Sequence, residues 1–498
     1  MSGRSKEQRK FAFHVGGEER GPVEERYFDS INPTTGEVWG EFAEAGAVDV
    51  DAAVRAANAA FRGAWRELSP TRRGRLLMRW ADLIARDAVA IARMETEQNG
   101  KLLSEMQAQA RVVTDWLYYF GGLADKVEGA VVPLERQSVL NYTLKEALGV
   151  VAVITPWNSP TFLAIMSIAP ALAAGNAIVL KPSEVTSGSA ILLARLAEEA
   201  GIPPGVINVV TGQRATGAAL VDHPLVRKIA FTGSVGAGQE IAARAGRRLI
   251  GATLELGGKS PNIVFADADF DLALVGVMAG IFAAAGQTCI AGSRAYVHAD
   301  IYDRFVAALV ERAKAIKLGD PLIGTTQMGP VATGGQLRKD EEMVQRALGE
   351  GAELLCGGKR PRVAECPNGF FFEPTILHCP DPQNHIVRNE VFGPVLAVAP
   401  FRSDEEVLAQ ANDSEFGLAA GVWTNSLARA HGFAKALQAG TVWINTYRAL
   451  AFNSPFGGYK SSGLGRLNGS AAIEQYLQTK SVWIEQSRQI QDPFVMRV

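Results

Sequence analysis

The sequence predicts an α/β fold built on open, twisted sheets of mainly parallel strands. Short, β-rich and mainly apolar runs alternate with helical patterns from residue 149 onward, and a second alternating set begins near residue 260. Strands that are apolar on both faces are typical of parallel β-α-β units. With 498 residues the chain exceeds what one hydrophobic core usually serves, so two or three domains are expected.

Helical periodicity dominates the first third of the chain. Alanine and valine recur at helical spacing over residues 50–61, and the pattern continues through 72–97 and 102–120. Residues 130–143 then alternate like a hairpin inserted before the first run of strands. This order places a helical region ahead of the first sheet.

The first set of strands ends in polar residues. In open parallel sheets, ligands bind beyond the carboxyl ends of the strands. Asn158, Lys181, Glu184 and Ser234 all stand at or just after such ends, which predicts a binding edge there. The strands are expected at 149–154, 177–180, 206–210 and 228–231, with a helix at 187–200.

The second set begins after residue 260. A helix is expected over 270–285, with Asp269 as its N-cap and Gly286 as its C-terminal stop. A late strand at 479–485 lies outside this set, and its edge can pair within the chain or with another subunit. Further strands are expected at 293–297, 371–376, 395–400 and 440–445.

Composition excludes several classes of protein. Apolar content of 47%, charged content of 20% and a net charge of −2 describe a globular chain without an electrostatic reason to bind nucleic acid or an anionic membrane. The four cysteines show no C-x-x-C spacing and the six histidines no H-E-x-x-H cluster. We therefore expect no metal site, no disulfide framework and a reducing compartment.

No targeting or membrane segment is expected. Residues 1–10 are polar and lack the apolar core of a signal peptide. The long apolar run over 160–180 is interrupted by Pro170, Gly175 and Asn176, so it is interpreted as a buried helix followed by a strand. The protein is predicted to be cytoplasmic.

One cysteine and one glutamate suggest covalent chemistry on a carbonyl. Cys289, in Gly286-Gln287-Thr288-Cys289, can attack a carbonyl carbon, and Glu255 can activate water to break the resulting thioester. Taken alone, Cys289 also fits a small core residue at the end of a helix, where the helix dipole opposes a thiolate. Glu255 lies between Leu254 and Leu256, and burial there would raise its pKa towards that of a useful base.

Two segments suggest a nucleotide site. Residues 231–238 contain Gly233, Gly236 and Gly238 between a strand and a helix, where backbone N–H groups can approach a pyrophosphate. A plain glycine-rich turn explains this pattern equally well, because it is not the G-x-G-x-x-G fingerprint. Ser183 and Glu184 can accept protons from ribose hydroxyls, or can simply cap the helix that follows.

Seven ordered motifs resemble those of the NAD(P)-dependent aldehyde dehydrogenases. The resemblance runs from about Asn32 to Trp483 and implies that family's Rossmann-type cofactor domain, α/β catalytic domain and small β oligomerisation extension. The motifs are Pro156-Trp157-Asn158, Lys181-Pro182-Ser183-Glu184, Phe231-Thr232-Gly233-Ser234, Leu254-Glu255-Leu256-Gly257-Gly258-Lys259, Gly286-Gln287-Thr288-Cys289, Glu390-Val391-Phe392-Gly393-Pro394 and Pro455-Phe456-Gly457-Gly458-Tyr459-Lys460.

The resemblance implies a role for each catalytic residue. Cys289 would attack the aldehyde, and the side-chain amide of Asn158 with the Cys289 backbone N–H would form the oxyanion hole. Hydride transfer to NAD would leave a thioester, which Glu255 would hydrolyse through an activated water.

The resemblance also implies a set of cofactor contacts. Lys181 and Glu184 would meet the adenosine ribose, Ser234 the pyrophosphate and Glu390 the nicotinamide ribose, with Phe392 packed nearby. The carboxylate of Glu184 competes with a 2′-phosphate, which favours NAD and leaves NADP as the alternative. The expected cofactor residues are Ile154, Thr155, Pro156, Trp157, Lys181, Ser183, Glu184, Gly233, Ser234, Glu390 and Phe392.

Departures from the family pattern indicate a wide substrate tunnel. Many relatives have aromatic residues where this chain has Ser159 and Ala283, and a tryptophan–lysine pair where it has Met166-Ser167. A bulky, apolar or aromatic aldehyde is therefore expected. A glutamate found in some relatives is Leu467 here, so the proton relay beyond Glu255 is not predicted. The expected tunnel residues are Trp116, Ser159, Met166, Ala283, Leu450 and Phe456.

Two other functions were weighed. In CoA-acylating semialdehyde dehydrogenases a thiol replaces water, but such relatives typically lack the glutamate at position 255. A non-catalytic structural protein of this fold would need none of Cys289, Asn158 and Glu255. The resemblance further suggests a homodimer or homotetramer, with residues 1–127 and 148–257 binding NAD, 258–460 forming the catalytic domain, and 128–147 and 478–498 mediating oligomerisation.

Overall fold

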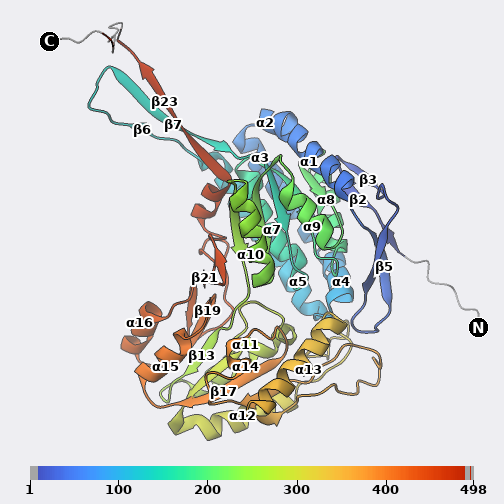
Figure 1. Cartoon of the computed structure of the whole chain (residues 1–498), viewed down its shortest axis with the longest axis vertical. Helices are drawn as coiled ribbons and strands as arrows, with labels where there is room; N and C mark the ends of the chain where they lie inside the picture. Colours follow the sequence, from blue (N-terminus) through green and yellow to red (C-terminus); the bar gives the residue numbers. More distant parts are fainter. Residues whose placement is uncertain (1–8, 488–493, 495–498) are drawn as a thin grey trace, which may run out of the picture.

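The computed structural model describes residues 9–487 and 494, which form two sheet-centred bodies and a projecting arm (Figure 1). Two sequence predictions fall partly outside the described residues. These are the polar N-terminus, of which residues 1–8 are not described, and the segment 478–498, of which residues 488–493 and 495–498 are not described.

The first body contains an eight-stranded sheet with the order β22-β12-β11-β8-β9-β10-β2-β3. Its five central strands are parallel, which confirms the four predicted strands, whereas the edge strands β22, β2 and β3 are antiparallel and were not predicted. The strands are β2 (Phe13–Val15), β3 (Glu18–Arg20), β8 (Val150–Ile154), β9 (Ala177–Lys181), β10 (Ile207–Val209), β11 (Val226–Thr232), β12 (Gly251–Glu255) and β22 (Gly463–Leu464).

Strand register brings the predicted binding residues to one edge of this sheet. Ile154 pairs with Lys181 on one side and with Phe231 on the other. One residue further along, Thr232 pairs with Glu255. The loops after β8, β9, β11 and β12 therefore leave the sheet at the same level.

Helices of the first body cover the sheet and largely follow the predicted periodicity. The pattern over 72–97 is broken at Asp87, whose dihedrals (φ −99°, ψ 12°) depart from the helix. The pattern over 102–120 is broken at Val113, where the Thr114 hydroxyl donates to the Arg111 carbonyl at 2.7 Å. The helices are α1 (Ala47–Arg62), α2 (Ala64–Glu67), α3 (Pro70–Arg86), α4 (Ala88–Asn99), α5 (Leu103–Val112), α6 (Thr114–Leu123), α7 (Pro160–Ala173), α8 (Gly188–Glu199), α9 (Arg214–Asp222) and α10 (Val235–Arg247).

The apolar run over 160–180 is the helix α7 followed by the strand β9, as the sequence predicts. Both are buried in the first body. Within the described part of the chain, none of the helices has the length and apolar character required to cross a membrane.

The second body contains a seven-stranded sheet with the order β15-β16-β17-β14-β13-β19-β20. The strand expected over 371–376 begins only at Thr375, because Pro374 has no N–H to contribute to the ladder. The other predicted strands of this set are confirmed. The strands are β13 (Pro261–Val264), β14 (Arg294–His298), β15 (Glu353–Cys356), β16 (Thr375–His378), β17 (Val395–Phe401), β19 (Ala419–Trp423) and β20 (Thr441–Ile444).

Helix α11 (Phe270–Phe282) begins as predicted but ends early. Asp269 caps it by accepting from the Leu272 N–H at 2.9 Å. The predicted end at Gly286 is wrong, because Ala283 is extended (φ −59°, ψ 141°) and Ala284 (φ 57°) and Ala285 (φ 50°) are left-handed. The other helices of this body are α12 (Tyr302–Lys314), α13 (Gly334–Gly349), α14 (His385–Arg388), α15 (Asp404–Asn412) and α16 (Leu427–Ala436).

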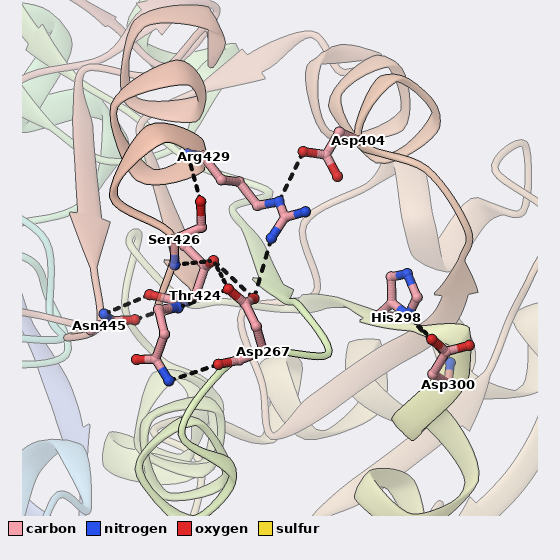
Figure 2. A network of polar contacts seen from close by, with 9 residues as sticks. Asp267, His298, Asp300, Asp404, Thr424, Ser426, Arg429 and Asn445 are labelled. Atoms are coloured by element: carbon pink, nitrogen blue, oxygen red, sulfur yellow. Dashed lines mark hydrogen bonds and ion pairs between the residues drawn. The ribbon is translucent and has the colours of Figure 1, made fainter.

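A network of polar contacts lies at the carboxyl end of the second sheet (Figure 2). The Arg429 guanidinium contacts Asp267 at 3.3 Å and Asp404 at 2.9 Å, and lies 4.4 Å from the ring centroid of Phe265. Thr424, after β19, donates to the Asp267 carboxylate at 2.9 Å. The charges of Arg429, Asp267 and Asp404 are thus paired with one another. The network links the ends of strands to the starts of the helices that follow them.

The arm projects from the first body (Figure 1). It consists of β6 (Val131–Val132), β7 (Val139–Ala147) and β23 (Leu477–Glu485). β23 pairs antiparallel with β7 along its whole length, from Leu477↔Ala147 to Glu485↔Val139. The strand predicted at 479–485 thus pairs within the chain, which is one of the two alternatives that the sequence left open.

Candidate active site

The predicted catalytic residues converge between the two sheets. Asn158 and Glu255 follow or end strands of the first sheet, at its carboxyl edge. Cys289 and Glu390 lie in loops that lead into β14 and β17, at the amino edge of the second sheet. The site is therefore assembled across the boundary between the two bodies.

Asn158 contacts the turn that carries Cys289. Its side-chain Nδ2 donates to the backbone carbonyl of Gln287 at 3.1 Å. An amide nitrogen has two hydrogens, so this bond leaves the second one to donate elsewhere. The Tyr447 hydroxyl donates to the Ile290 carbonyl at 3.0 Å and fixes the other end of the turn.

The surroundings of Cys289 favour the protonated thiol over the thiolate. Burial raises its pKa to about 12, with further contributions from the negative charges of Glu390 and Glu255. Its own backbone N–H and the Lys101 ammonium act in the opposite direction. A base or a bound cation is required to generate the thiolate.

Glu255 is a buried carboxyl group at the end of β12. Burial raises its pKa well above the ordinary 4.5, and the Arg466 guanidinium only partly opposes this shift. Neither carboxyl oxygen has a hydrogen-bond partner among the residues that the structure describes. The raised pKa makes this carboxylate a stronger proton acceptor than an exposed glutamate.

Two glycines allow the site to close around Glu390. The Gly258 N–H donates to Glu390 Oε1 at 2.9 Å, and a Cβ at Gly257 would lie 2.5 Å from Glu390 Oε2. A Cβ at Gly258 would lie 2.4 Å from the Cys289 carbonyl oxygen. Side chains at these two positions would separate Glu390 from the Cys289 turn.

Most of the predicted cofactor residues line one cleft of about 610 Å³. Phe392 lies outside this set but its ring meets that of Trp157 edge-on, with centroids 5.3 Å apart. Glu390 lies on Gly258, beside the Cys289 turn. The predicted residues that line the cleft are Ile154, Thr155, Pro156, Trp157, Lys181, Ser183, Glu184, Gly233 and Ser234.

One wall of the cleft is the N-terminus of α10. Ser234 caps this helix by accepting from the Ala237 N–H at 3.4 Å, and the helix end carries partial positive charge. A Cβ at Gly238 would lie 2.5 Å from Leu256, so glycine lets α10 pack closely on the chain after β12. Two arginines of the cleft, Arg214 and Arg244, both pair with Glu240.

The predicted tunnel residues are not all in one place. Met166 and Phe456 are buried in the hydrophobic cluster that also contacts Cys289. Ser159 accepts a hydrogen bond from the Lys101 ammonium at 3.4 Å. Leu450 is 37% exposed, and Ala283 lines an open groove of about 400 Å³.

Trp116 packs against two other aromatic residues, neither of which was among the predicted tunnel residues. Its ring meets Phe162 at 5.0 Å and Phe452 at 6.0 Å between centroids, both edge-on, and its indole N–H donates to Asn468. Phe162 and Phe452 pack on the same cluster as Cys289. Phe162 lies in the first turn of α7, directly after the Asn158 loop, and this closeness in sequence to Asn158 is the signal that points to it.

Two further charged residues reach the site without a sequence signal. Lys101 is buried beside it, and burial lowers its pKa to about 8. Glu105 accepts a hydrogen bond from the Ala284 N–H at 3.1 Å. All four cysteines are free thiols, and over residues 9–487 no three His, Cys, Asp or Glu side chains form a group able to hold a metal ion.

The fold and this arrangement define a family, and comparison with known proteins identifies it. Residues 21–482 match the profile of the aldehyde dehydrogenase family, and the chain belongs to that family. A (Z)-2-((N-methylformamido)methylene)-5-hydroxybutyrolactone dehydrogenase of Acinetobacter baylyi is 44% identical over 94% of this chain and 96% of its own length. A betaine aldehyde dehydrogenase of Brucella anthropi is 45% identical over 92% of this chain and 94% of its own.

Solved structures agree with this assignment and confirm the predicted fold class. A betaine aldehyde dehydrogenase from Staphylococcus aureus in complex with NAD+ is 39% identical, with a TM-score of 0.95 over 97% of each chain. An aldehyde dehydrogenase from Bacillus cereus, also an NAD+ complex, is 40% identical, with a TM-score of 0.93 over 96% of this chain and 97% of that one.

Proposed function

We propose that this protein oxidises an aldehyde to its carboxylic acid with NAD, through a thioester on Cys289 that Glu255 hydrolyses. The convergence of Cys289, Asn158 and the buried Glu255 beside the cleft supports this proposal most strongly. Two structural relatives that are NAD+ complexes support the choice of cofactor.

The cleft fits NAD. The N-terminus of α10 suits a pyrophosphate, since its free N–H groups and partial charge attract anions. Glu184 can accept from ribose hydroxyls and repels a 2′-phosphate. Because Arg214 and Arg244 pair with Glu240, their charges are already partly neutralised, which also favours NAD over NADP.

The reaction begins with the Cys289 thiol. Its sulfur forms a bond to the aldehyde carbon, its proton passes to a base, and the aldehyde oxygen gains negative charge. The second Asn158 amide hydrogen and the Cys289 backbone N–H stabilise that oxygen. When bound, NAD supplies a positive ring that favours the thiolate and accepts the hydride that leaves the carbon.

Glu255 completes the reaction. It removes a proton from a water molecule, whose oxygen attacks the thioester carbon while the carbon–sulfur bond breaks. The carboxylic acid leaves and Cys289 regains its proton. A carboxyl with a raised pKa suits this role, because it is a stronger base than an exposed glutamate. The presence of Glu255 also favours hydrolysis of the thioester over transfer of the acyl group to CoA.

The substrate is proposed to be a bulky, neutral aldehyde, apolar or aromatic. The rings of Trp116, Phe162 and Phe452 offer an apolar wall on the cluster that contacts Cys289. Lys101 and Arg448 lie close enough that the Arg448 charge lowers the pKa of Lys101. With the carboxyl groups of Glu255 and Glu390 also near Cys289, these two cations leave the site without the excess of negative charge that would attract a cationic substrate such as betaine aldehyde.

An aldehyde panel tests the proposal. Aliphatic, aromatic, carboxylated and betaine aldehydes are assayed for NADH and NADPH production, with and without CoA. We expect benzaldehyde-like compounds with NAD to give the highest kcat/KM, with no requirement for CoA. Cys289→Ala should abolish NADH formation while NAD still binds, and Cys356→Ala, a second buried cysteine, should remain active. An active Cys289→Ala enzyme would refute the mechanism.

Single-turnover kinetics separate the two halves of the reaction. Glu255→Gln should still release a burst of NADH equal to the enzyme present, because acylation does not need the water-activating base, and should then stall. An unchanged steady-state rate would remove Glu255 from its proposed role.

We also propose that the arm mediates assembly into a homodimer or homotetramer. Trp483 and Val131 on the arm are 63% and 72% exposed, which is a large apolar exposure for paired strands. Trp483→Lys should lower the sedimentation coefficient, whereas Leu427→Lys, at an equally exposed site on α16, should not. The domain boundaries and the cytoplasmic location stay predictions.

A further inference from the structure

Three successive residues before Cys289 take left-handed backbone conformations. These are Ala284 (φ 57°), Ala285 (φ 50°) and Gly286 (φ 70°). Glycine adopts this conformation freely, but in alanine the Cβ approaches the carbonyl oxygen and incurs a steric cost. Such strain persists only where the surrounding structure holds it in place.

The Glu105 side chain holds the first of these residues. From the first turn of α5, its Oε1 accepts from the Ala284 N–H at 3.1 Å. Its Oε2 is buried and has no hydrogen-bond partner among the residues described. Gly286 is held from the other side, where an added Cβ would lie 2.0 Å from the Gly393 carbonyl oxygen.

The same stretch of chain contacts both neighbours of Asn158. Asn99 Nδ2 donates to the Trp157 carbonyl at 3.3 Å, and the Lys101 ammonium donates to the Ser159 hydroxyl at 3.4 Å. Residues 99–105 therefore bond to the Asn158 loop at one end and to the strained turn before Cys289 at the other.

We propose that residues 99–105 form a brace that positions the Cys289 turn against Asn158, with Glu105 as its principal positioning residue. The inference rests on the proposed function, because it takes Cys289 and Asn158 as the reacting pair. Glu105 acts through the Ala284 N–H. Without this acceptor the turn can relax towards right-handed dihedrals, which rotates the Cys289 N–H and thiol away from the aldehyde.

Substitution of Glu105 gives the first test, made on the full-length enzyme with NAD and its best aldehyde from the panel. Glu105→Ala should lower kcat about a hundredfold while KM and NAD affinity change little, as expected for a misplacement of about 1 Å at a reacting group. Glu105→Gln keeps an oxygen acceptor and should stay within about threefold of the wild type. Glu311→Ala, which removes an exposed glutamate of α12 outside the brace, is the matched control.

A rescue experiment separates positioning from general stability. Ala284→Gly removes the steric cost of the left-handed conformation, so in the Glu105→Ala background it should restore about tenfold in kcat. Since relief of this strain also raises the melting temperature, kcat is measured well below the melting temperature of every variant, where a loss of stability alone leaves kcat unchanged. Melting temperatures of all variants identify any that fail to fold, and the Glu105→Gln and double variants then decide.

Three outcomes would overturn the brace: full activity of Glu105→Ala, equal impairment of Glu105→Gln and Glu105→Ala, or no rescue by Ala284→Gly. These outcomes are distinct from a failure of the proposed function, which would show as activity in Cys289→Ala. If Cys289→Ala is inactive while Glu105→Ala is fully active, only the brace is refuted.

Discussion

The side-chain amide of Asn158 donates a hydrogen bond to the Gln287 carbonyl at 3.1 Å, and so links the first sheet to the turn that carries Cys289. Gln287 is itself fixed, because its side-chain Oε1 accepts from the Ala332 N–H at 2.8 Å. The proposed oxyanion donor and the proposed nucleophile are thus linked by one set of hydrogen bonds across the two bodies. Each member of this set can be removed separately.

Asn158→Ala should impair catalysis far more than binding. It deletes the proposed oxyanion donor and the bond to Gln287 together, and loss of one such donor typically costs about 10²–10³ in kcat. Steady-state kinetics should show the loss in kcat, with KM and the NAD dissociation constant nearly unchanged. The exposed Asn425→Ala, on the far edge of the second sheet, serves as the control. A fall in NAD affinity that accounts for the whole effect would argue for a cofactor role instead.

Glu255→Gln should stabilise the protein at about pH 8. Burial raises the pKa of Glu255, so above pH 4.5 the folded state binds more protons than the unfolded chain, and stability falls as pH rises through this window. Glutamine has no such dependence. The melting temperature of Glu255→Gln should exceed that of the wild type by a few degrees at about pH 8, and the difference should shrink towards about pH 5.

The exposed Glu128→Gln variant provides the matched control for this pH series. It should follow the wild type at every pH, because this side chain is exposed to solvent in the folded protein as it is in the unfolded chain. A Glu255→Gln variant that is less stable than the wild type at about pH 8 would contradict the picture of an unpaired buried carboxyl.

The residues that sequence analysis located best are those at strand ends. Mainly apolar runs define β8, β9 and β11, and the polar residues at or after their ends include Asn158, Lys181 and Ser234. The turn before Cys289 was not predictable in the same way. Alanine favours helix, so Ala284 and Ala285 extended the predicted helix, whereas the structure imposes left-handed dihedrals on them through contacts distant in sequence.

Edge strands and long-range polar contacts explain the remaining differences. β2, β3 and β22 are two or three residues long, too short for an alternating pattern to show. Glu105 has no local feature that points to Ala284, which is distant in sequence but adjacent in space. Such partners emerge only when the two bodies are placed together.

Glu184→Ser should increase the use of NADP. Removing the carboxylate relieves its repulsion of a 2′-phosphate. The interaction free energy of one charge pair near a protein surface corresponds to about a tenfold gain in kcat/KM with NADP. Activity with NAD should fall modestly, because a ribose contact is weakened. Glu311→Ser, exposed on α12, should leave the NAD to NADP ratio unchanged. An unchanged ratio in Glu184→Ser would place the selectivity elsewhere in the cleft.

Gly457→Ala should displace the Glu255 carboxyl group without removing it. A Cβ at Gly457 would lie 2.9 Å from Glu255 Oε1 and 2.8 Å from the Gly465 carbonyl oxygen, so the carboxyl must move. Since a general base needs hydrogen-bond reach to its water, deacylation should slow by about tenfold or more while the NADH burst persists. Gly432→Ala on α16 meets no atom within 4 Å and should retain full turnover. A Gly457→Ala enzyme that lost the burst as well would show that the glycine supports Cys289 and not Glu255 alone.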